Sequence, residues 1–210
     1  MKPIVAAFDF DGTLSRGVSG LRFFRQILGP VSYSWFWLRQ LPALITYGIR
    51  SNHEVSLEKI NRHIFARQNA ENVAAAAEHF AQNELSRHLF PDTLETITAL
   101  RERGVRCVIV SRGYEAYLRP WAQSIGIQDV LGTRLETGAD GKLTGMMPEP
   151  SCDGSEKVRR LRLLLGDRSA VELYAYGDGP GDFALFREAD FAFVRRGQSF
   201  ETWSENEERP

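Results

Sequence analysis

The sequence predicts an α/β fold, a doubly wound parallel sheet that carries a second, all-helical domain as an insertion. The first observation is the apolar run at 4–8, which does not alternate with polar residues and is typical of a strand buried on both faces. Similar runs at 105–110 and 171–176 alternate with helical patterns, as in parallel sheets. The stretch from about 15 to 90 shows no strand pattern and is too long for a loop.

The elements follow in order along the chain. Residues 15–90 are predicted to be wholly helical, because stretches such as 71–89 are rich in Ala, Glu, Gln and Leu. A further helix begins at Pro91 and Asp92 and ends before Gly104. The strand at 105–110 is followed by a helix at 115–124, which Pro120 should kink or split.

The last third of the chain continues the alternation. Two short strands are expected at 129–135 and 142–146, then a helix at 157–165, the strand at 171–176, a short helix at 183–188 and a last strand at 191–194. The acidic stretch 201–208 is predicted to fray as a tail. We therefore expect an α/β core of residues 1–14 and 91–210, with 15–90 as a helical domain over the strand ends.

Composition and charge indicate a soluble globular protein. The 210 residues are 43% hydrophobic and 25% charged, and the net charge of −1 gives no attraction to nucleic acid. The charge is unevenly placed, since no Asp or Glu occurs between Asp11 and Glu54. The charged residues of that window are Arg16, Arg22, Arg25, Arg39 and Arg50.

Cysteine usage and the amino-terminal run predict a cytoplasmic location. Cys107 lies in an apolar run and Cys152 in a Pro/Ser/Gly loop, and two free thiols are typical of a reducing compartment. Asp9 interrupts the apolar amino-terminal run, so no signal peptide is expected.

One aromatic segment, 33–49, raises the question of a membrane. It is shorter than the roughly 20 residues of a spanning helix and contains Arg39 and Pro42. A buried or partner-facing helical hairpin is favoured, and peripheral contact with a membrane surface is the alternative. The residues that would make that contact are Trp35, Phe36, Trp37 and Arg39.

Two carboxylates, Asp9 and Asp11, come directly after the first strand. In an extended chain both side chains point the same way, and two like charges this close need a cation or a shared proton. An oxygen-only pair suits a hard cation such as Mg²⁺, and Gly12 allows a sharp turn. The alternative is an ordinary acidic turn.

Other polar residues stand at strand ends or at the start of a helix. Ser111 follows the second strand, Lys157 begins a helix, and Asp178 and Asp182 follow the strand at 171–176. The carboxyl ends of parallel strands share one edge, so these residues should converge on one crevice. Taken singly, Ser111 could cap a helix, Lys157 could be solvated, and the two aspartates could form a turn and a helix cap.

In this order, these residues make the chain resemble the haloacid dehalogenase superfamily of phosphatases. The matching segments are DFDGT at 9–13, VIVSRG with Ser111, CDGSEKVRRL with Lys157, and GDGPGD with Asp178 and Asp182. The segment GTRLETGADGKLTG, which precedes CDGSEKV, is similar to sequences of the phosphoserine-phosphatase-like branch. Members of that branch have a Rossmann-like core and a helical cap after the first motif.

The resemblance implies a chemical role for each acidic residue. Asp9 would be the nucleophile that forms an aspartyl-phosphate, and Asp11 would protonate the leaving group and then deprotonate water. Mg²⁺ would neutralise the repulsion between carboxylate and phosphate. The implied metal site consists of Asp9, Asp11 through its backbone carbonyl, Asp178, and Asp182, which would orient that shell or a bound water.

It also implies the substrate contacts. Ser111 and the amides that follow it would hold phosphoryl oxygens, Lys157 would offset charge, and Thr13 would fix the loop around Asp11. Arg16 is the arginine nearest to the catalytic loop. The candidate phosphate- and substrate-binding residues are therefore Ser111, Arg112, Gly113, Lys157, Thr13 and Arg16.

The substrate is predicted to be a small or lipid-like anionic phosphate ester. Phosphoserine phosphatases place an acidic residue shortly after the first motif for the substrate's amino group, but 15–19 contains none. Arginines and aromatics over the crevice would favour an anionic, apolar ester, although they could equally face solvent and pack the cap. Phosphotransfer to another alcohol stays open. A receiver-type signalling domain and a catalytically silent phosphate-binding protein fit the motifs less well.

Overall fold

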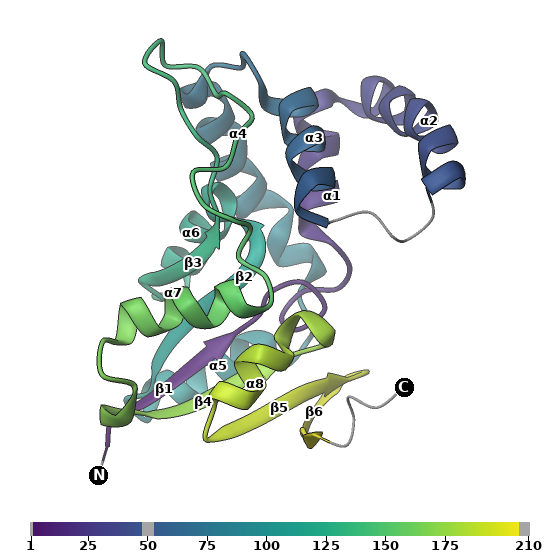
Figure 1. Cartoon of the computed structure of the whole chain (residues 1–210). Coiled ribbons are helices and arrows are strands. Elements are labelled where there is room, and N and C mark those ends of the chain that lie inside the picture. Colours follow the sequence, from purple (N-terminus) through teal and green to yellow (C-terminus); the bar gives the residue numbers. More distant parts are fainter. Residues whose placement is uncertain (1, 48–52, 206–210) are drawn as a thin grey trace.

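The computed structural model describes residues 2–47 and 53–205, and within them a six-stranded sheet forms the centre of the protein (Figure 1). The strand order is β3-β2-β1-β4-β5-β6. Strands β1 to β5 are parallel, and β6 is antiparallel to β5. The strands are β1 (Ile4–Phe8), β2 (Arg106–Tyr114), β3 (Asp129–Thr133), β4 (Glu172–Gly177), β5 (Phe191–Arg196) and β6 (Ser199–Thr202). The predicted doubly wound parallel sheet is confirmed.

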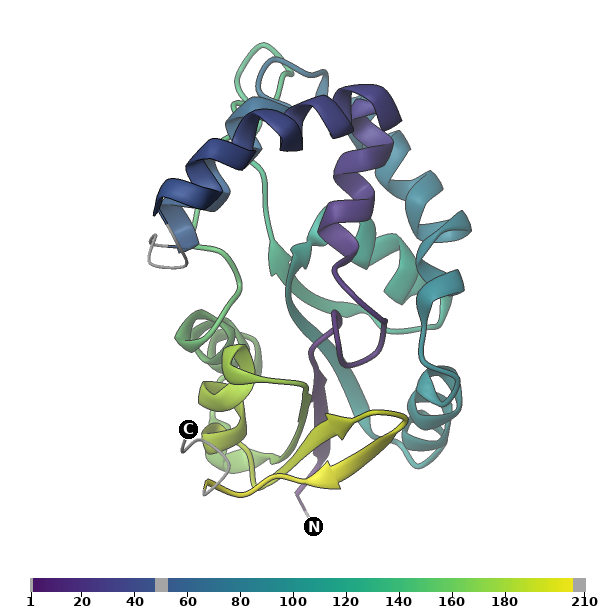
Figure 2. The same cartoon turned by 90° about the vertical axis from the view of Figure 1, so that its right-hand side faces the viewer.

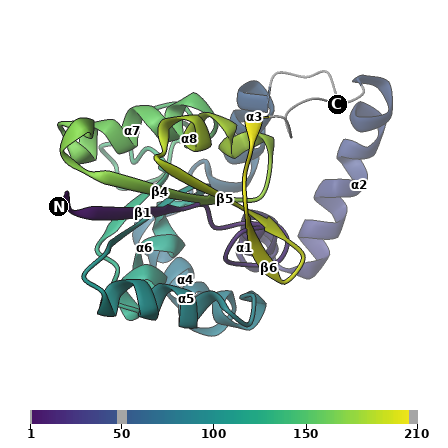
Figure 3. The same ribbon diagram turned by 90° about the horizontal axis from the view of Figure 1, so that it is seen from below.

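Helices cover both faces of this sheet (Figure 3). One layer holds α7 (Ser155–Leu165) and α8 (Phe183–Glu188), and the other holds α4 (Ala70–Asn83), α5 (Thr93–Glu102) and α6 (Glu115–Ser124). Along β1, Val5 and Ala7 belong to one hydrophobic core, whereas Ala6 and Phe8 belong to the other. The unbroken apolar run of β1 is explained by this burial on both faces.

Three further helices lie beyond the carboxyl ends of the strands (Figure 2). They are α1 (Ser19–Leu28), α2 (Pro30–Tyr47) and α3 (His53–Phe65), and α4 leads the chain back toward the sheet. Short 3₁₀ turns occur at Leu85–His88, Arg168–Ala170 and Pro180–Asp182. The segment 15–90 is helical as expected, apart from residues 48–52, which lie outside the described part.

The chain leaves and re-enters the core through two segments that pair with each other. Ser15 bridges Leu89, the Phe90 amide donates to the Leu14 carbonyl at 2.9 Å, and the Arg16 amide donates to the His88 carbonyl at 2.8 Å. The predicted domain boundaries, 14/15 and 90/91, fall at this pairing. The division into core and cap stays a prediction.

Three local expectations are wrong in whole or in part. Residues 142–146 form only isolated bridges, through Lys142 and Leu143, because their partners are loop residues and not a strand. Pro120 does not split α6, since one missing N–H donor is outweighed by the buried face of the helix, and the predicted kink stays a prediction. The predicted tail at 201–208 begins inside β6, which includes Glu201 and Thr202, and the Phe200 ring of β6 packs against Tyr176 with ring centroids 5.0 Å apart.

Candidate active site

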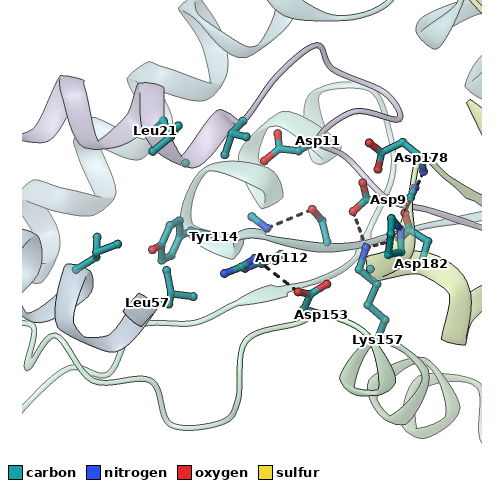
Figure 4. Close-up of a pocket in the computed structure, with 18 of the residues that line it drawn as sticks. Asp9, Asp11, Leu21, Leu57, Arg112, Tyr114, Asp153, Lys157, Asp178 and Asp182 are labelled. Atoms are coloured by element: carbon teal, nitrogen blue, oxygen red, sulfur yellow. Dashed lines mark hydrogen bonds and ion pairs between the residues drawn. The ribbon is translucent and has the colours of Figure 1, made fainter. Parts of the chain in front are cut away.

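A cavity of about 470 Å³ lies where the carboxyl ends of β1, β2 and β4 meet α1 and α3 (Figure 4). One end is polar and the other apolar. The polar lining includes Asp9, Asp11, Ser111, Arg112, Asp153, Lys157, Asp178 and Asp182. Because the carboxyl ends of parallel strands share one edge of the sheet, most of the candidate residues predicted from the sequence lie together in this cavity.

The centre of the polar end is the buried carboxylate of Asp9. The Lys157 ammonium donates to Asp9 Oδ1 and to Asp182 Oδ1, both at 2.6 Å. Lys157 is 2% exposed, so it is not a solvated helix residue. Carboxylate oxygens of Asp9, Asp178 and Asp182 lie within 4.8 Å of one another. Three hard oxygen donors at this spacing fit a divalent cation such as Mg²⁺.

The protonation equilibria of this cluster indicate an excess of negative charge. Burial raises the pKa of Asp9 to about 7; Lys157 opposes this shift and Asp182 adds to it. The Asp178 side chain keeps contact with solvent. Partial burial, together with the charge of Asp182, nevertheless raises the pKa of Asp178 to about 6. Burial alone would lower the pKa of Lys157, but Asp9 and Asp182 outweigh it and raise that pKa. A bound cation would relieve the same excess.

Asp11 lies in a different environment from Asp9. The Ser19 amide donates to Asp11 Oδ1 at 2.9 Å, and the Ser19 hydroxyl donates to Oδ2 at 3.0 Å. That hydroxyl is also 2.8 Å from the Tyr117 hydroxyl. Burial raises the pKa of Asp11, while the bonds from Ser19 oppose the shift. Its carboxylate is outside the acidic cluster found among the described residues, and the metal contact through its backbone carbonyl stays a prediction.

The last residues of β2 form one wall of the cavity. Ser111 lies inside β2, and its hydroxyl accepts from the Gly113 amide at 3.2 Å. It does not cap α6, whose N-cap is Tyr114. Arg112 forms an ion pair with Asp153 at 3.6 Å. The sequence did not single out Asp153, although it is an acid in the loop just before Lys157.

Two predicted substrate contacts do not line the cavity. Thr13 is fully buried, and its hydroxyl donates to Asp9 Oδ2 at 3.2 Å, so it holds the carboxylate in place. Arg16 is exposed, with its guanidinium 5.1 Å from the centre of the Phe90 ring. The paired segments around Ser15 and Leu89 hold its backbone there, and among the described arginines it is Arg112 that lines the cavity.

Two glycines let backbone approach the acidic cluster. Gly12 has φ +83°, and a Cβ there would lie 2.0 Å from Asp178 Oδ2. A Cβ on Gly177 would lie 2.5 Å from Asp182 Cγ. Glycine is therefore required at both positions by space, and at Gly12 also by conformation.

The opposite end of the cavity is apolar. Its lining comes from α1, from the residue before it, and from α3: Val18, Leu21, Phe24, Leu57 and Ile60. Figure 4 shows Leu21 and Leu57 on the side of the cavity away from Asp9 and Lys157. Among the described residues, the lining from this helical region includes no acidic side chain. No pattern in the sequence indicates that these particular residues face the site.

The carboxyl edge of the parallel sheet holds an aspartate that could act as a nucleophile, a buried lysine and two further aspartates. This combination is typical of one family of hydrolases. The chain belongs to the haloacid dehalogenase-like hydrolases, whose family model matches residues 6–187. Curated relatives that match part of the chain include phosphoserine phosphatases, and they support the phosphatase and the phosphoserine-phosphatase-like branch predicted from the sequence.

Several individual proteins resemble it. Protein CicA of Caulobacter vibrioides is 32% identical over 189 residues, which cover 90% of this chain and 84% of that protein. Histidinol-phosphatase of Neisseria meningitidis is 27% identical over 127 residues, covering 58% of this chain and 57% of that protein.

Two solved structures share the fold. A protein of unknown function from Bordetella pertussis Tohama I has a TM-score of 0.79 at 21% identity, with 92% of this chain and 90% of that chain covered. A phosphoserine phosphatase solved as a phospho-aspartyl intermediate analogue has a TM-score of 0.59 at 22% identity, with 92% and 87% covered. At these identities the likeness shows the fold alone.

Proposed function

We propose that this protein is a Mg²⁺-dependent phosphomonoester hydrolase that works through an aspartyl-phosphate on Asp9. The observation that carries the proposal is the contact of the buried Asp9 carboxylate with Lys157, beside Asp178 and Asp182, at the polar end of a cavity. A nucleophile held this way is oriented and partly desolvated, and a neighbouring cation compensates its charge.

The metal is held by Asp9, Asp178 and the backbone carbonyl of Asp11, with Asp182 orienting the site. When bound, Mg²⁺ offsets the repulsion between the Asp9 carboxylate and the phosphate dianion. Asp182 also accepts from the Asp178 amide at 3.0 Å and from Lys157, and these contacts suit an orienting residue.

The chain's own groups account for each proton. An Asp9 oxygen forms a bond to phosphorus, the phosphorus–oxygen ester bond breaks, and Asp11 gives its proton to the leaving alkoxide. Asp11 then takes a proton from water, which attacks the aspartyl-phosphate and releases inorganic phosphate. Ser111 and the amides after it hold phosphoryl oxygens, and Lys157 stabilises the charge that develops.

The substrate is an anionic phosphate ester with an apolar body, small or lipid-like. The apolar lining from α1 and α3 supports the body, and Arg112 at the wall supports a further negative group. Phosphoserine carries an ammonium group, and no acidic side chain from the helical lining is present to receive it. The proposal therefore departs from the substrate in the names of several relatives.

An ester panel tests this function. We expect hydrolysis of a medium-chain alkyl phosphate with a higher kcat/KM than phosphoserine, complete loss in excess chelator, and recovery with Mg²⁺. Asp9→Asn should lower turnover by orders of magnitude, whereas Asp140→Asn, at an exposed loop position, should not. Chelator-resistant turnover, or a preference for phosphoserine, would contradict the proposal.

A further inference from the structure

The outward side of α2 is an exposed apolar stripe. Val31 is 81% exposed, Trp35 55% and Leu38 57%. The spacing of four and three residues places them on one side of the helix, where Ser34 joins them in a shallow groove. We call Val31, Ser34, Trp35 and Leu38 the α2 outer face. Figures 1 and 3 show α2 at the edge of the molecule, set apart from the sheet and its covering helices.

The inward side of α2 explains how the helix is attached. Phe36 is buried, with its ring 4.8 Å from that of His63 on α3, and Trp37 packs edge-on against Tyr33 at 6.2 Å. Phe36 is therefore not free for the membrane contact that the sequence suggested, and Trp37 is half-buried. A helix that is apolar on both sides needs a second partner, which the described residues do not supply to the outer face.

A basic side chain borders this face. The Arg39 guanidinium lies 5.2 Å from the centre of the Trp35 ring, beside the stripe. The sequence contains no Asp or Glu from residue 12 to residue 53, so no acidic side chain of α1 or α2 offsets this charge. Tryptophan and leucine next to arginine, without acids, are the composition of helices that lie in the headgroup region of anionic bilayers.

The size of the α2 outer face favours a membrane over a protein as its partner. A stable protein interface buries about 800 Å² on each side, more than one convex helical stripe provides. Shallow insertion into a bilayer needs only such a stripe and nearby basic side chains. No helix among the described residues is long and apolar enough to cross a membrane, so contact with the surface is the form that fits.

We propose that the α2 outer face binds the surface of an anionic phospholipid membrane. Helices α1 and α3, on either side of α2 in the chain, supply the apolar lining of the cavity through Leu21, Phe24, Leu57 and Ile60. Docking through α2 therefore brings the apolar end of the cavity close to lipid. The catalytic consequence, access to lipid phosphate esters, rests on the proposed function, whereas the binding itself does not.

Vesicle co-sedimentation tests the binding. We expect the protein to sediment with vesicles of phosphatidylcholine and phosphatidylglycerol, weakly with phosphatidylcholine alone, and less as salt rises. The double variant Trp35→Ser/Leu38→Ser should lose roughly tenfold or more in binding. Leu163→Ser, at another exposed leucine on α7, is the matched control and should bind like the parent protein. All three proteins should hydrolyse a water-soluble ester equally, which shows that they are folded.

Three outcomes would overturn this inference: no binding to anionic vesicles, equal binding by the double variant, or a concentration-dependent dimer that only the double variant abolishes. The last would show that a second copy covers the face. Phosphatidylglycerol is a phosphodiester, so its binding is measured without turnover. Binding without phosphatase activity would refute only the proposed function, and activity without binding would refute only the membrane surface.

Discussion

Asp9 and Asp11 stand two residues apart, yet their surroundings separate them chemically. The Asp9 carboxylate contacts the Lys157 ammonium and lies within 4.8 Å of two further carboxylates, whereas Asp11 accepts two hydrogen bonds from Ser19. An ammonium suits a carboxylate that stays ionised and attacks; hydrogen-bond donors of moderate strength suit one that gains and loses a proton. The sequence predicts the pair and its roles through the motif, but not the Ser19 contact, because that depends on where α1 begins in space.

This separation predicts a dependence on the leaving group. Asp11→Asn should slow an alkyl phosphate far more than nitrophenyl phosphate, because nitrophenolate leaves without needing a proton. The ratio of kcat values for the two esters, in variant and parent, is the measurement. Asp9→Asn is the control, since it should abolish both reactions. An equal loss for both esters in Asp11→Asn would assign Asp11 a structural or metal-holding role.

At the scale of elements, the segments that enter and leave the helical region are tied to the sheet by Arg195 of β5. Its Nε donates to the Thr13 carbonyl at 2.9 Å, and its Nη1 donates to both carboxylate oxygens of Asp92 at 2.9 Å. The guanidinium lies 4.4 Å from the Phe90 ring centre and 3.9 Å from that of Phe200 on β6. β6 therefore completes the enclosure of this arginine. The sequence did not predict β6, because the acidic stretch that begins at Glu201 is typical of a solvated tail.

Arg195→Met should destabilise the fold, because it leaves the Thr13 carbonyl and Asp92 without their partner. Asp92 is one-third exposed, so water recovers part of the loss, and we expect unfolding free energy to fall by about 2–4 kcal/mol. Urea unfolding measures this, with Arg103→Met at an exposed position as control. A fall of less than about 0.5 kcal/mol, the usual size of a surface effect, would mean that Arg195 does not hold these segments.

For the whole molecule, what the sequence predicts well is what depends on local pattern and topology. Apolar runs without alternation identify β1, β2 and β4, and the shared carboxyl edge of a parallel sheet then brings Asp9, Ser111, Lys157, Asp178 and Asp182 together. Neither the strands nor their shared edge depends on how individual side chains pack, so both can be predicted from the sequence. The positions of domain boundaries and the roles of the site residues stay predictions.

What the sequence did not predict depends on how helices pack. Arg16 and Arg112 are both substrate-binding candidates from the sequence, but only Arg112, carried by the register of β2, lines the cavity. The aromatic segment of α2 gave no indication that Phe36 would turn inward and Trp35 outward. The apolar cavity wall likewise comes from α1 and α3 side chains whose facing is set by tertiary contacts.

The central claim is that Asp9 carries the phosphoryl group, and the most direct measurement is mass spectrometry of acid-quenched protein during turnover. Asp11→Asn with nitrophenyl phosphate and Mg²⁺ is the form to use, because it can complete the first step but lacks the base for the second. We predict that the peptide containing Asp9 gains one phosphoryl group, and that the gain vanishes with a chelator or in the Asp9→Asn/Asp11→Asn double variant. A phosphoryl group on Ser111, or steady hydrolysis by Asp9→Asn, would contradict the account.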